Sequence, residues 1–234
     1  AEDQDKRPAV DPDKVIDLSA KMAADGTLSW DVPEGAWTLL RLGHGSTGVV
    51  NQPAPKSGTG LEADKMNRRA VDSHWKHGIQ PILNHLGPLA GETLTNIVID
   101  SYEAKHHAWT PDMRAEFKQR RGYDMGPFLV SLTGRCVGDI ARTERFYDDF
   151  RRTIGDLVTE NYYGYMAELC HNHGLKIAIE PYRGPFESMT VAMQADIPTG
   201  EFFSDLGYGV PFLKLCSSAA IFFFNDTATT EIYT

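Results

Sequence analysis

The sequence predicts an α/β fold with a mainly parallel sheet and helices outside it. Three short apolar runs, at residues 96–103, 175–182 and 195–202, each have the pattern of a strand followed by a carboxylate. The first run is unbroken, which is typical of a strand buried on both faces. Helical patterns separate the runs, and such alternation indicates a parallel sheet. Neither GxGxxG nor GxxxxGK[ST] follows any of these three runs, which argues against a nucleotide-binding open sheet built on them; the GxGxxG pattern at residues 43–48 lies ahead of all three.

Composition narrows the class of protein. The net charge of -9 argues against nucleic acid as a partner, because phosphate binding needs a basic surface. No run is long and apolar enough to span a bilayer, so the sequence predicts no membrane segment. The 234 residues are fewer than the roughly 250 that a (β/α)8 barrel typically needs. A barrel here would therefore be partial.

The first third of the chain has little helical character. Residues 1–27 are polar and form a segment of their own, with at most one short edge element. Residues 28–32 and 37–42 flank the turn sequence Pro33-Glu34-Gly35, which predicts a short β-hairpin ahead of the barrel segment. Residues 43–60 are rich in glycine and form a long loop, and such loops are often functional or mobile.

The expected helices have recognisable ends. Pro81 predicts a kink or two shorter pieces in the first helix. Thr110 is the predicted N-cap of the second helix, and Gly122 closes it. Gly174 ends the longest helix just before the strand that leads to Glu180. The expected helical stretches are residues 63–86, 110–121, 143–173, 185–194 and, as a helix start, 213–220.

The last fourteen residues differ from the rest. Residues 221–234 show no helical period and resemble a translated sequencing adapter, so we expect a non-native tail after Ala220. The alternative is an ordinary terminal strand, because Phe, Ile, Thr and Tyr favour strands. The expected organisation is thus a polar segment at 1–27, a catalytic domain at 28–220 and a tail at 221–234.

Carboxylates at strand ends carry the main chemical signal. Glu103, Glu180 and Glu201 each lie beside aromatic residues or proline. Aromatic rings stack on sugars, and burial beside them raises a carboxyl pKa, which suits the paired acids of glycoside hydrolysis. The alternative is that these glutamates cap helices or pair with arginines.

Other polar residues are candidates for ligand contact. Asp100 either binds a metal or orients the loop that follows it, since calcium prefers carboxylate and carbonyl oxygens. The histidines lack the spacing of a zinc site. The candidate substrate-binding residues are His44, Asp100, Tyr102, His107, Trp109, Glu180 and Tyr182.

Several motifs together resemble glycoside hydrolase family 106, the α-L-rhamnosidases. They include Asp100-Ser101-Tyr102-Glu103 and Glu180-Pro181-Tyr182, and the resemblance covers roughly residues 28–220. The stretches that carry it are 31–41, 43–48, 53–55, 60–65, 99–103, 109–111, 120–124, 150–154, 160–163, 179–182 and 200–202.

The resemblance implies a catalytic (β/α)8-type domain within a longer multidomain enzyme. It implies hydrolysis of terminal α-L-rhamnosyl residues with inversion, assisted by calcium, in the periplasm or outside the cell. Glu103 matches the general acid, while no motif for the general base occurs in this chain. Glu180 and Glu201 are then calcium or sugar ligands. The chain is identified as a truncated member of this family, and we expect it to be inactive or nearly so. A retaining glycosidase and a non-catalytic carbohydrate-binding module are the alternatives.

Overall fold

A computed structural model describes residues 9–52, 54–105, 107–201 and 210–226. The chain divides into two compact units, one of Ala1–Gly45 with Pro111–Thr153 and the other of Ser46–Thr110 with Ile154–Thr234. Each unit is described by itself below. Helix α4 (Ile140–Val158) begins in the first unit and ends in the second.

The first unit has an aromatic core between its helices. Phe117 of α3 (Met113–Arg121) and Phe146 of α4 are both fully buried, and their ring centroids lie 5.8 Å apart. Phe128 lies in the 3-10 helix Gly126–Thr133 and stacks on Phe146, with the ring centroids 5.5 Å apart. Two further 3-10 turns, Pro12–Lys14 and Ser19–Lys21, lie in the N-terminal stretch.

Helix α3 begins later than the sequence predicts. Asp112 occupies the N-cap position, not Thr110, and its side chain makes no capping hydrogen bond. The Thr110 hydroxyl donates to Asp64 over 2.8 Å instead, so a tertiary contact replaces the local cap. The predicted closure is confirmed, because Gly122 has a left-handed φ of 82°.

The predicted β-hairpin at residues 28–42 is wrong. These residues form no paired strands, and Val32 and Leu39 are 62% and 61% exposed. Alternating apolar residues stabilise a hairpin only when one face packs on a core. The described part of this unit provides no such surface for either side chain.

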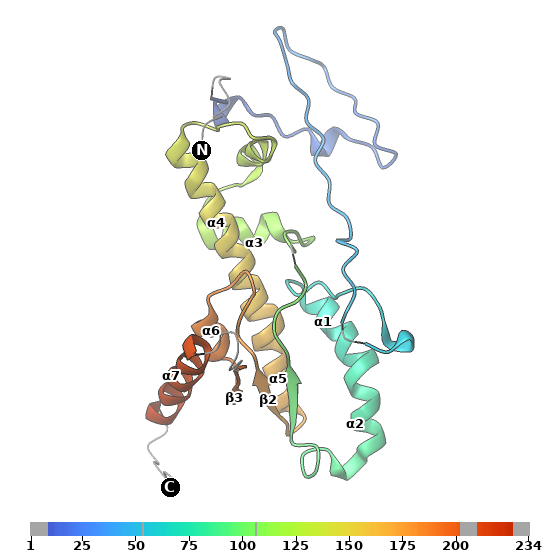
Figure 1. The fold of residues 1–234 in the computed structure, drawn as a ribbon. Coiled ribbons are helices and arrows are strands. Elements are labelled where there is room, and N and C mark those ends of the chain that lie inside the picture. The colour runs from blue at the N-terminus through green and yellow to red at the C-terminus, as the bar shows by residue number, and fades with distance from the viewer. Residues whose placement is uncertain (1–8, 53, 106, 202–209, 227–234) are drawn as a thin grey trace. The chain divides into compact units, whose positions relative to one another are not determined.

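The second unit contains the parallel sheet. Its described strands are β1 (Asn96–Ile99), β2 (Lys176–Ile179) and β3 (Ile197–Pro198), hydrogen-bonded in the order β1-β2-β3 (Figure 1). Both pairs are parallel, with Ile99 opposite Ile179 and Ile179 opposite Pro198. The predicted α/β class with a small parallel sheet is confirmed.

Only the middle strand is buried on both faces. Ile177, Ala178 and Ile179 of β2 are at most 3% exposed. Val98 of β1 is 63% exposed, so the prediction that the first strand is buried on both faces is wrong. The reason is its position, since β1 is an edge strand of the described sheet and no described element covers the Val98 side chain.

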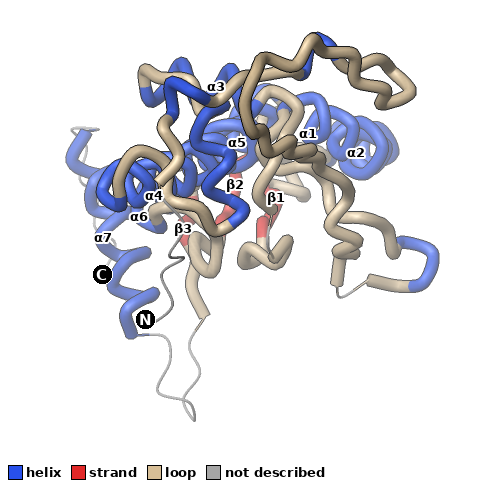
Figure 2. The backbone as a smooth tube through the Cα atoms, turned by 90° about the horizontal axis from the view of Figure 1, so that it is seen from above, coloured by secondary structure: helices blue, strands red, loops and turns tan. Residues whose placement is uncertain are grey.

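Helices of the second unit lie against the sheet and each other. Helix α5 (Tyr165–Asn172) contacts β2, while α7 (Val210–Asp226) contacts β3 and α6 (Ser188–Ala192) (Figure 2). Helix α1 (Arg68–His74) joins α5 through a hydrogen bond of 2.6 Å from the Tyr165 hydroxyl to Asp72. A 3-10 turn at Gly87–Leu89 follows α2, and another lies at Lys56–Gly58.

The two long predicted helices are each interrupted by a π-helical turn. Trp75–Ile79 separates α1 from α2 (Gln80–Leu86), and Pro81 lies in the first turn of α2, as its missing N–H permits. Thr159–Gly164 separates α4 from α5. Gly174 follows with a φ of 70° and leads into β2, as predicted.

Helix α7 is longer than expected. It begins at Val210 and continues through Asp226, so both the absence of helical structure after Ala220 and the alternative of a terminal strand are wrong for residues 221–226. Residues 227–234 lie outside the described part. Helix formation is cooperative, so an established helix extends through residues of modest propensity.

The backbone of Pro185 approaches Gly155 closely. A Cβ at this position of α4 would lie 2.7 Å from the Pro185 carbonyl oxygen. Gly155→Ala should therefore lower the free energy of unfolding by about 1–3 kcal/mol, despite the roughly 1 kcal/mol that alanine gains in a helix. Thermal unfolding followed by circular dichroism measures this change.

Gly164→Ala is the matched control. Its added Cβ would first meet the amide oxygen of Gln194, the end of a flexible side chain, at 3.1 Å. We expect this variant to be as stable as the parent or more so. Equal melting temperatures for the two variants would contradict the proposed clash.

Candidate active site

Parallel register places three carboxylates at one edge of the sheet. Asp100 directly follows β1, Glu180 directly follows β2, and Glu201 comes three residues after β3. The ladder continues past the strands, since the Glu180 amide donates to the Ile99 carbonyl over 3.0 Å. The Thr199 amide likewise donates to Ile179 over 2.8 Å. Carboxyl edges of parallel sheets are where ligands bind in α/β proteins.

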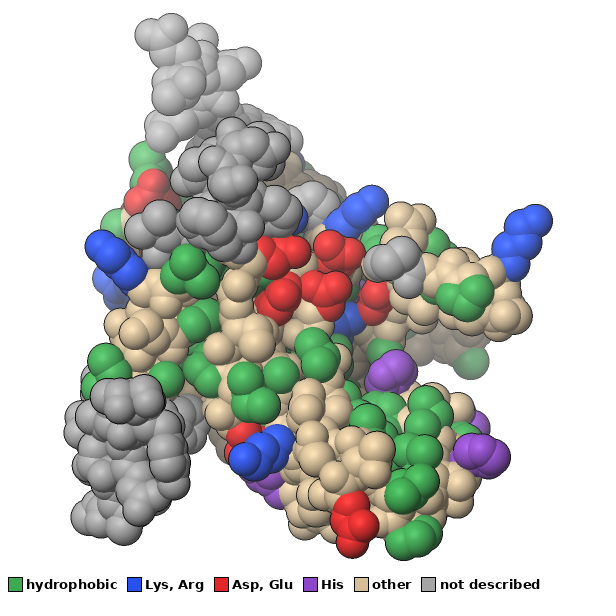
Figure 3. Space-filling model, turned by 60° about the horizontal axis from the view of Figure 1, so that its bottom comes forward, with side chains coloured by type: hydrophobic (Ala, Val, Ile, Leu, Met, Phe, Trp, Pro, Cys, Tyr) green, Lys and Arg blue, Asp and Glu red, His purple; other side chains and the backbone are tan. Residues whose placement is uncertain are grey.

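The Glu180 carboxyl has two acidic neighbours at this edge, Asp100 and Glu201. Burial raises the pKa of the Glu180 carboxyl, and a hydrogen bond with Asp100 and the charges of Asp100 and Glu201 raise it further. The Tyr182 hydroxyl opposes this effect by donating to Oε2 of Glu180 over 2.8 Å. Like charges in contact favour retention of a proton by one of them. The face drawn in Figure 3 shows acidic side chains gathered beside one another.

Tyr182 fixes the position of Glu180. Its side chain is 1% exposed, and its ring centroid lies 4.5 Å from that of Phe212 in α7. Burial and the hydrogen bond to Glu180 both raise the pKa of the phenol, so the hydroxyl stays protonated and remains a donor. The predicted pairing of Glu180 with an aromatic neighbour thus has a direct geometric basis.

Glu103 lies on the loop that leaves β1 and is exposed. The Ser101 hydroxyl donates to its Oε1 over 3.4 Å. Tyr102 anchors this loop, because its side chain is 4% exposed and its ring meets Phe186 edge-on at 5.8 Å. The Tyr102 amide also donates to the Tyr182 carbonyl over 3.2 Å, which joins the exits of β1 and β2.

A second polar group lies under the same loop. Asp64 accepts a hydrogen bond from the Thr110 hydroxyl over 2.8 Å and lies 3.0 Å from Nε2 of His107. Nε2 of His107 is directed at this carboxylate, and the buried Nδ1 has no partner within the described residues. Burial raises the pKa of Asp64, but hydrogen bonds from His107, Thr110 and the Met66 amide outweigh it and lower the pKa overall.

Lys65 is a buried cation next to this group. Its ammonium pairs with Glu62 and lies 5.2 Å from the Tyr162 ring centroid and 5.9 Å from that of Tyr102. No sequence pattern singled out Asp64 or Lys65 as functional. The available signals were the charged run at residues 62–65 and the family resemblance of residues 60–65, and neither shows which side chains become buried.

Backbone strain is present on both carboxylate loops. Lys105 has a φ of 54° and Arg183 a φ of 65°, and they are the non-glycine residues with positive φ in the described chain. Each follows a site residue closely, Lys105 after Glu103 and Arg183 after Tyr182. Left-handed conformations of such residues cost energy and cluster at functional sites.

The remaining candidates lie in different environments. His44 is exposed and belongs to the other unit, while His107 and Trp109 are half-buried on the loop after Glu103. The structure therefore brings together Asp100, Glu180, Tyr182 and Glu201, and it joins Tyr102 to them through the backbone.

The carboxylates have the right chemistry for calcium but not a complete ligand set. Calcium takes six to eight oxygen ligands. Within the described residues, no group of three or more histidine, cysteine, aspartate or glutamate side chains is arranged to hold a metal ion. The calcium site therefore stays a prediction.

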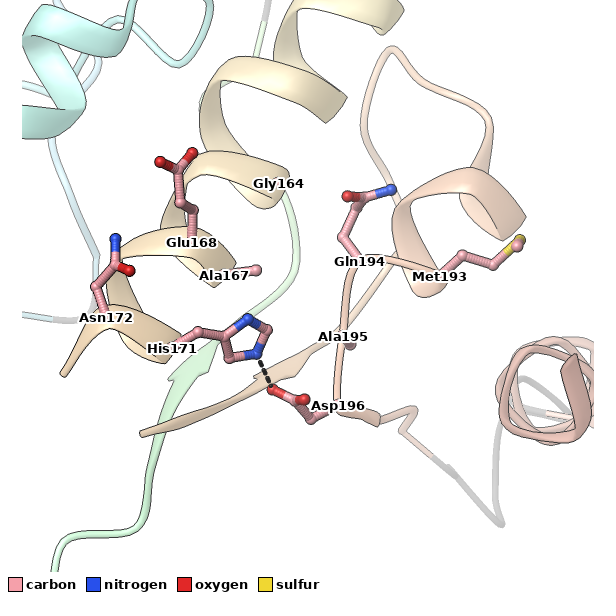
Figure 4. A pocket seen from close by; sticks show the side chains of 9 residues that line it. All are labelled: Gly164, Ala167, Glu168, His171, Asn172, Met193, Gln194, Ala195 and Asp196. Atoms are coloured by element: carbon pink, nitrogen blue, oxygen red, sulfur yellow. Dashed lines mark hydrogen bonds and ion pairs between the residues drawn. The ribbon is translucent and has the colours of Figure 1, made fainter. Parts of the chain in front are cut away.

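A pocket of about 410 Å³ lies at the opposite edge of the sheet (Figure 4). His171 projects into it from α5, and its Nε2 lies 2.9 Å from Oδ2 of Asp196, just before β3. Oδ2 also accepts from the Ile177 amide over 2.8 Å. These contacts fix the start of β2 against β3, so we assign this region to stability.

Carboxylates at the carboxyl edge of a parallel sheet are typical of glycoside hydrolase sites. A model of glycoside hydrolase family 106, described as alpha-L-rhamnosidase, matches residues 1–209, and the chain belongs to this family. The match includes residues 1–27, which the sequence analysis placed outside the resemblance, and stops before residues 210–220.

Two relatives show how much of a longer protein the chain represents. A Formosa agariphila protein named "Putative beta-glucuronidase" is 50% identical over 210 residues, which are 88% of this chain and 18% of that protein. The structure of a rhamnosidase from Novosphingobium sp. PP1Y matches with a TM-score of 0.79 and 35% identity. That match covers 91% of this chain and 22% of the rhamnosidase. The chain thus spans about a fifth of each relative. None of the described helices is long and apolar enough to cross a membrane.

The Asp64 contacts predict a stability that depends on pH. The folded-state pKa of Asp64 is lowered. Its stabilising contribution is therefore present above the unfolded pKa of about 3.9 and is lost as pH falls below that value. Asp64→Asn should reduce the free energy of unfolding by about 1–3 kcal/mol at pH 7. The difference should shrink toward pH 3, as measured by urea unfolding with tryptophan fluorescence.

Asp31→Asn is the control for this change, because Asp31 is exposed. Its urea midpoint should equal that of the parent chain at both pH values. An Asp64→Asn midpoint that matches the parent at pH 7 would show that the contacts of Asp64 do not stabilise the fold.

Proposed function

We propose that this chain supplies the acid half of a site that hydrolyses terminal α-L-rhamnosyl residues with inversion. The observation that carries the proposal is the register of β1, β2 and β3, which sets Asp100, Glu180 and Glu201 at one edge beside the loop of Glu103. Membership of the rhamnosidase family supports the substrate class. In this proposal Glu103 is the general acid and protonates the leaving oxygen.

Asp100 and Glu180 do not suit the roles of the inverting pair. Inverting enzymes separate their two carboxyl groups by roughly 6.5–9.5 Å to admit a water molecule. Asp100 and Glu180 share a hydrogen bond, so they lie closer together than an inverting pair. We infer that the general base comes from outside the described residues and that Glu180 binds or orients the sugar.

Unpaired strand edges support a partial (β/α)8 barrel. Both edge strands of the described sheet have one unpaired side, and the exposed Val98 needs a cover. Further strands of a longer polypeptide would supply both, in line with the fifth of each relative that this chain spans. Remaining domains of that polypeptide are thus the proposed partners, together with a carbohydrate substrate.

Calcium and location complete the proposal. Glu180 and Glu201 would supply carboxylate ligands for a calcium ion, and other segments would supply the rest, since calcium needs several oxygens. Bound calcium would provide a positive charge for sugar hydroxyl groups. His107 and Trp109 are proposed sugar contacts, with Trp109 offering a face for stacking, while the buried Tyr102 supports their loop. We propose the periplasm or the cell exterior as the location, in line with the family resemblance.

A β-glucuronidase is the second candidate, because a relative with 50% identity has that name. Its substrate carries a carboxylate, which the acidic edge around Glu180 would repel. A neutral rhamnoside avoids that repulsion. Hydrolysis rates on an aryl α-L-rhamnoside and an aryl β-glucuronide separate the two candidates, and the anomer of the released sugar separates inversion from retention.

Glu103→Gln tests the acid directly. In a polypeptide that carries this chain at the full length of its relatives, we expect kcat for a rhamnosyl disaccharide to fall by about 10²–10⁴. Rhamnose binding, measured by calorimetry, should persist because the substitution keeps the shape of the side chain. Lost activity with retained binding also excludes a purely carbohydrate-binding module.

Glu92→Gln is the matched control, since Glu92 is exposed in the turn before β1. It should leave both hydrolysis and binding unchanged. Full activity of Glu103→Gln would remove Glu103 from the role of general acid.

The 234-residue chain alone should not hydrolyse rhamnosides. It lacks a general base in this proposal, and the second carboxylate is required to activate water. An assay with an aryl α-L-rhamnoside measures this, with the longer polypeptide as the positive control. Robust turnover by the short chain would show that its own residues include the base.

A further inference from the structure

A cavity of about 490 Å³ adjoins Glu103. Its lining consists of Glu103 and four residues of one loop, namely Asn51, Gln52, Ala54 and Thr59. All of them belong to the second unit, so the cavity does not depend on how the two units are placed. Ligand sites commonly have volumes of 300–1,000 Å³.

The loop that lines this cavity is held in shape by its own hydrogen bonds. Val50 and Leu61 form an antiparallel bridge at its base. The Asn51 side chain accepts from the Gly60 amide over 2.8 Å and donates to the Gly58 carbonyl over 3.1 Å. These bonds hold Asn51 in place before any ligand arrives, which reduces the entropy lost on binding.

The polar groups of this wall are uncharged. Gln52 is exposed, and its amide makes no side-chain hydrogen bond within the described residues, so one acceptor and two donors are available. The Thr59 hydroxyl donates to the Pro55 carbonyl over 3.1 Å and can still accept. No aromatic ring is among the described lining residues. Such a wall suits the hydroxyl groups of a neutral sugar better than it suits an aryl group or an ion.

We propose that this cavity is the leaving-group subsite and that Gln52 selects a neutral sugar as the leaving group. This inference rests on the function proposed above, because a general acid must lie beside the oxygen of the group that departs. Glu103 is the one proposed catalytic residue among the described lining residues, so a glycosidic oxygen at Glu103 directs the departing sugar toward Asn51, Gln52 and Thr59. The rhamnosyl ring then lies toward Glu180.

Gln52→Ala distinguishes this subsite from a site for the rhamnosyl ring. The variant is made in a polypeptide that carries this chain at the full length of its relatives. There, kcat/KM is measured for a rhamnosyl-sugar disaccharide and for 4-nitrophenyl α-L-rhamnoside. Loss of one neutral hydrogen bond should reduce the disaccharide value about five-fold more than the nitrophenyl value. An unchanged circular dichroism spectrum and melting temperature show that the exposed substitution has not altered the fold.

Gln119→Ala is the control, because Gln119 is an exposed glutamine on α3 of the other unit. It should leave both kcat/KM values unchanged. Equal losses on both substrates for Gln52→Ala would overturn the inference and place the rhamnosyl ring in the cavity. No loss on the disaccharide would also overturn it. If the unmodified enzyme turns over neither rhamnoside, the proposed function fails and the subsite fails with it.

Discussion

The parallel pairing of β2 with both of its neighbours is the constraint on which the site depends. Ile99 lies opposite Ile179, and Ile179 lies opposite Pro198, so the three strands end at nearly the same level. The residues that follow are therefore forced together whatever their charge. A shift of one residue would turn every side chain to the other face and separate the acids. The buried apolar residues of β2 specify this register.

Holding these carboxylates close together costs electrostatic free energy. Burial and the neighbouring carboxylates raise the pKa of Glu180, so the folded chain holds these groups in a state that water alone would not favour. Tyr182 offsets part of this cost through its hydrogen bond to Glu180, and packing on Phe212 keeps it in place. Positive φ angles at Lys105 and Arg183 add strain on the adjoining loops. Strained backbone and perturbed acids at one edge are features that cluster at ligand-binding sites.

Two supports under the Glu103 loop come from residues distant in the sequence. Asp64 holds Thr110 and His107, while Lys65 lies against the rings of Tyr102 and Tyr162. These contacts hold the Tyr102 side chain, and the Tyr102 amide donates a hydrogen bond to the Tyr182 carbonyl just after β2. The loop at residues 51–59 adds a wall beside Glu103. Glu103 is exposed but rests on a well-packed base, which suits a group that must meet a substrate in a fixed position.

The sequence by itself determined the elements with strong local signals. Unbroken apolar runs followed by carboxylates identified the strands and Glu180, and glycines at 122 and 174 marked helix ends, because these signals act within a few residues. Tertiary structure decided the rest. Residues 28–42 have strand-like alternation but no packed face, Thr110 bonds to Asp64 instead of capping α3, and Val98 is exposed on an edge strand. Burial of Asp64 and Lys65 and the wall around Glu103 depend on contacts over more than forty positions, which no local pattern encodes.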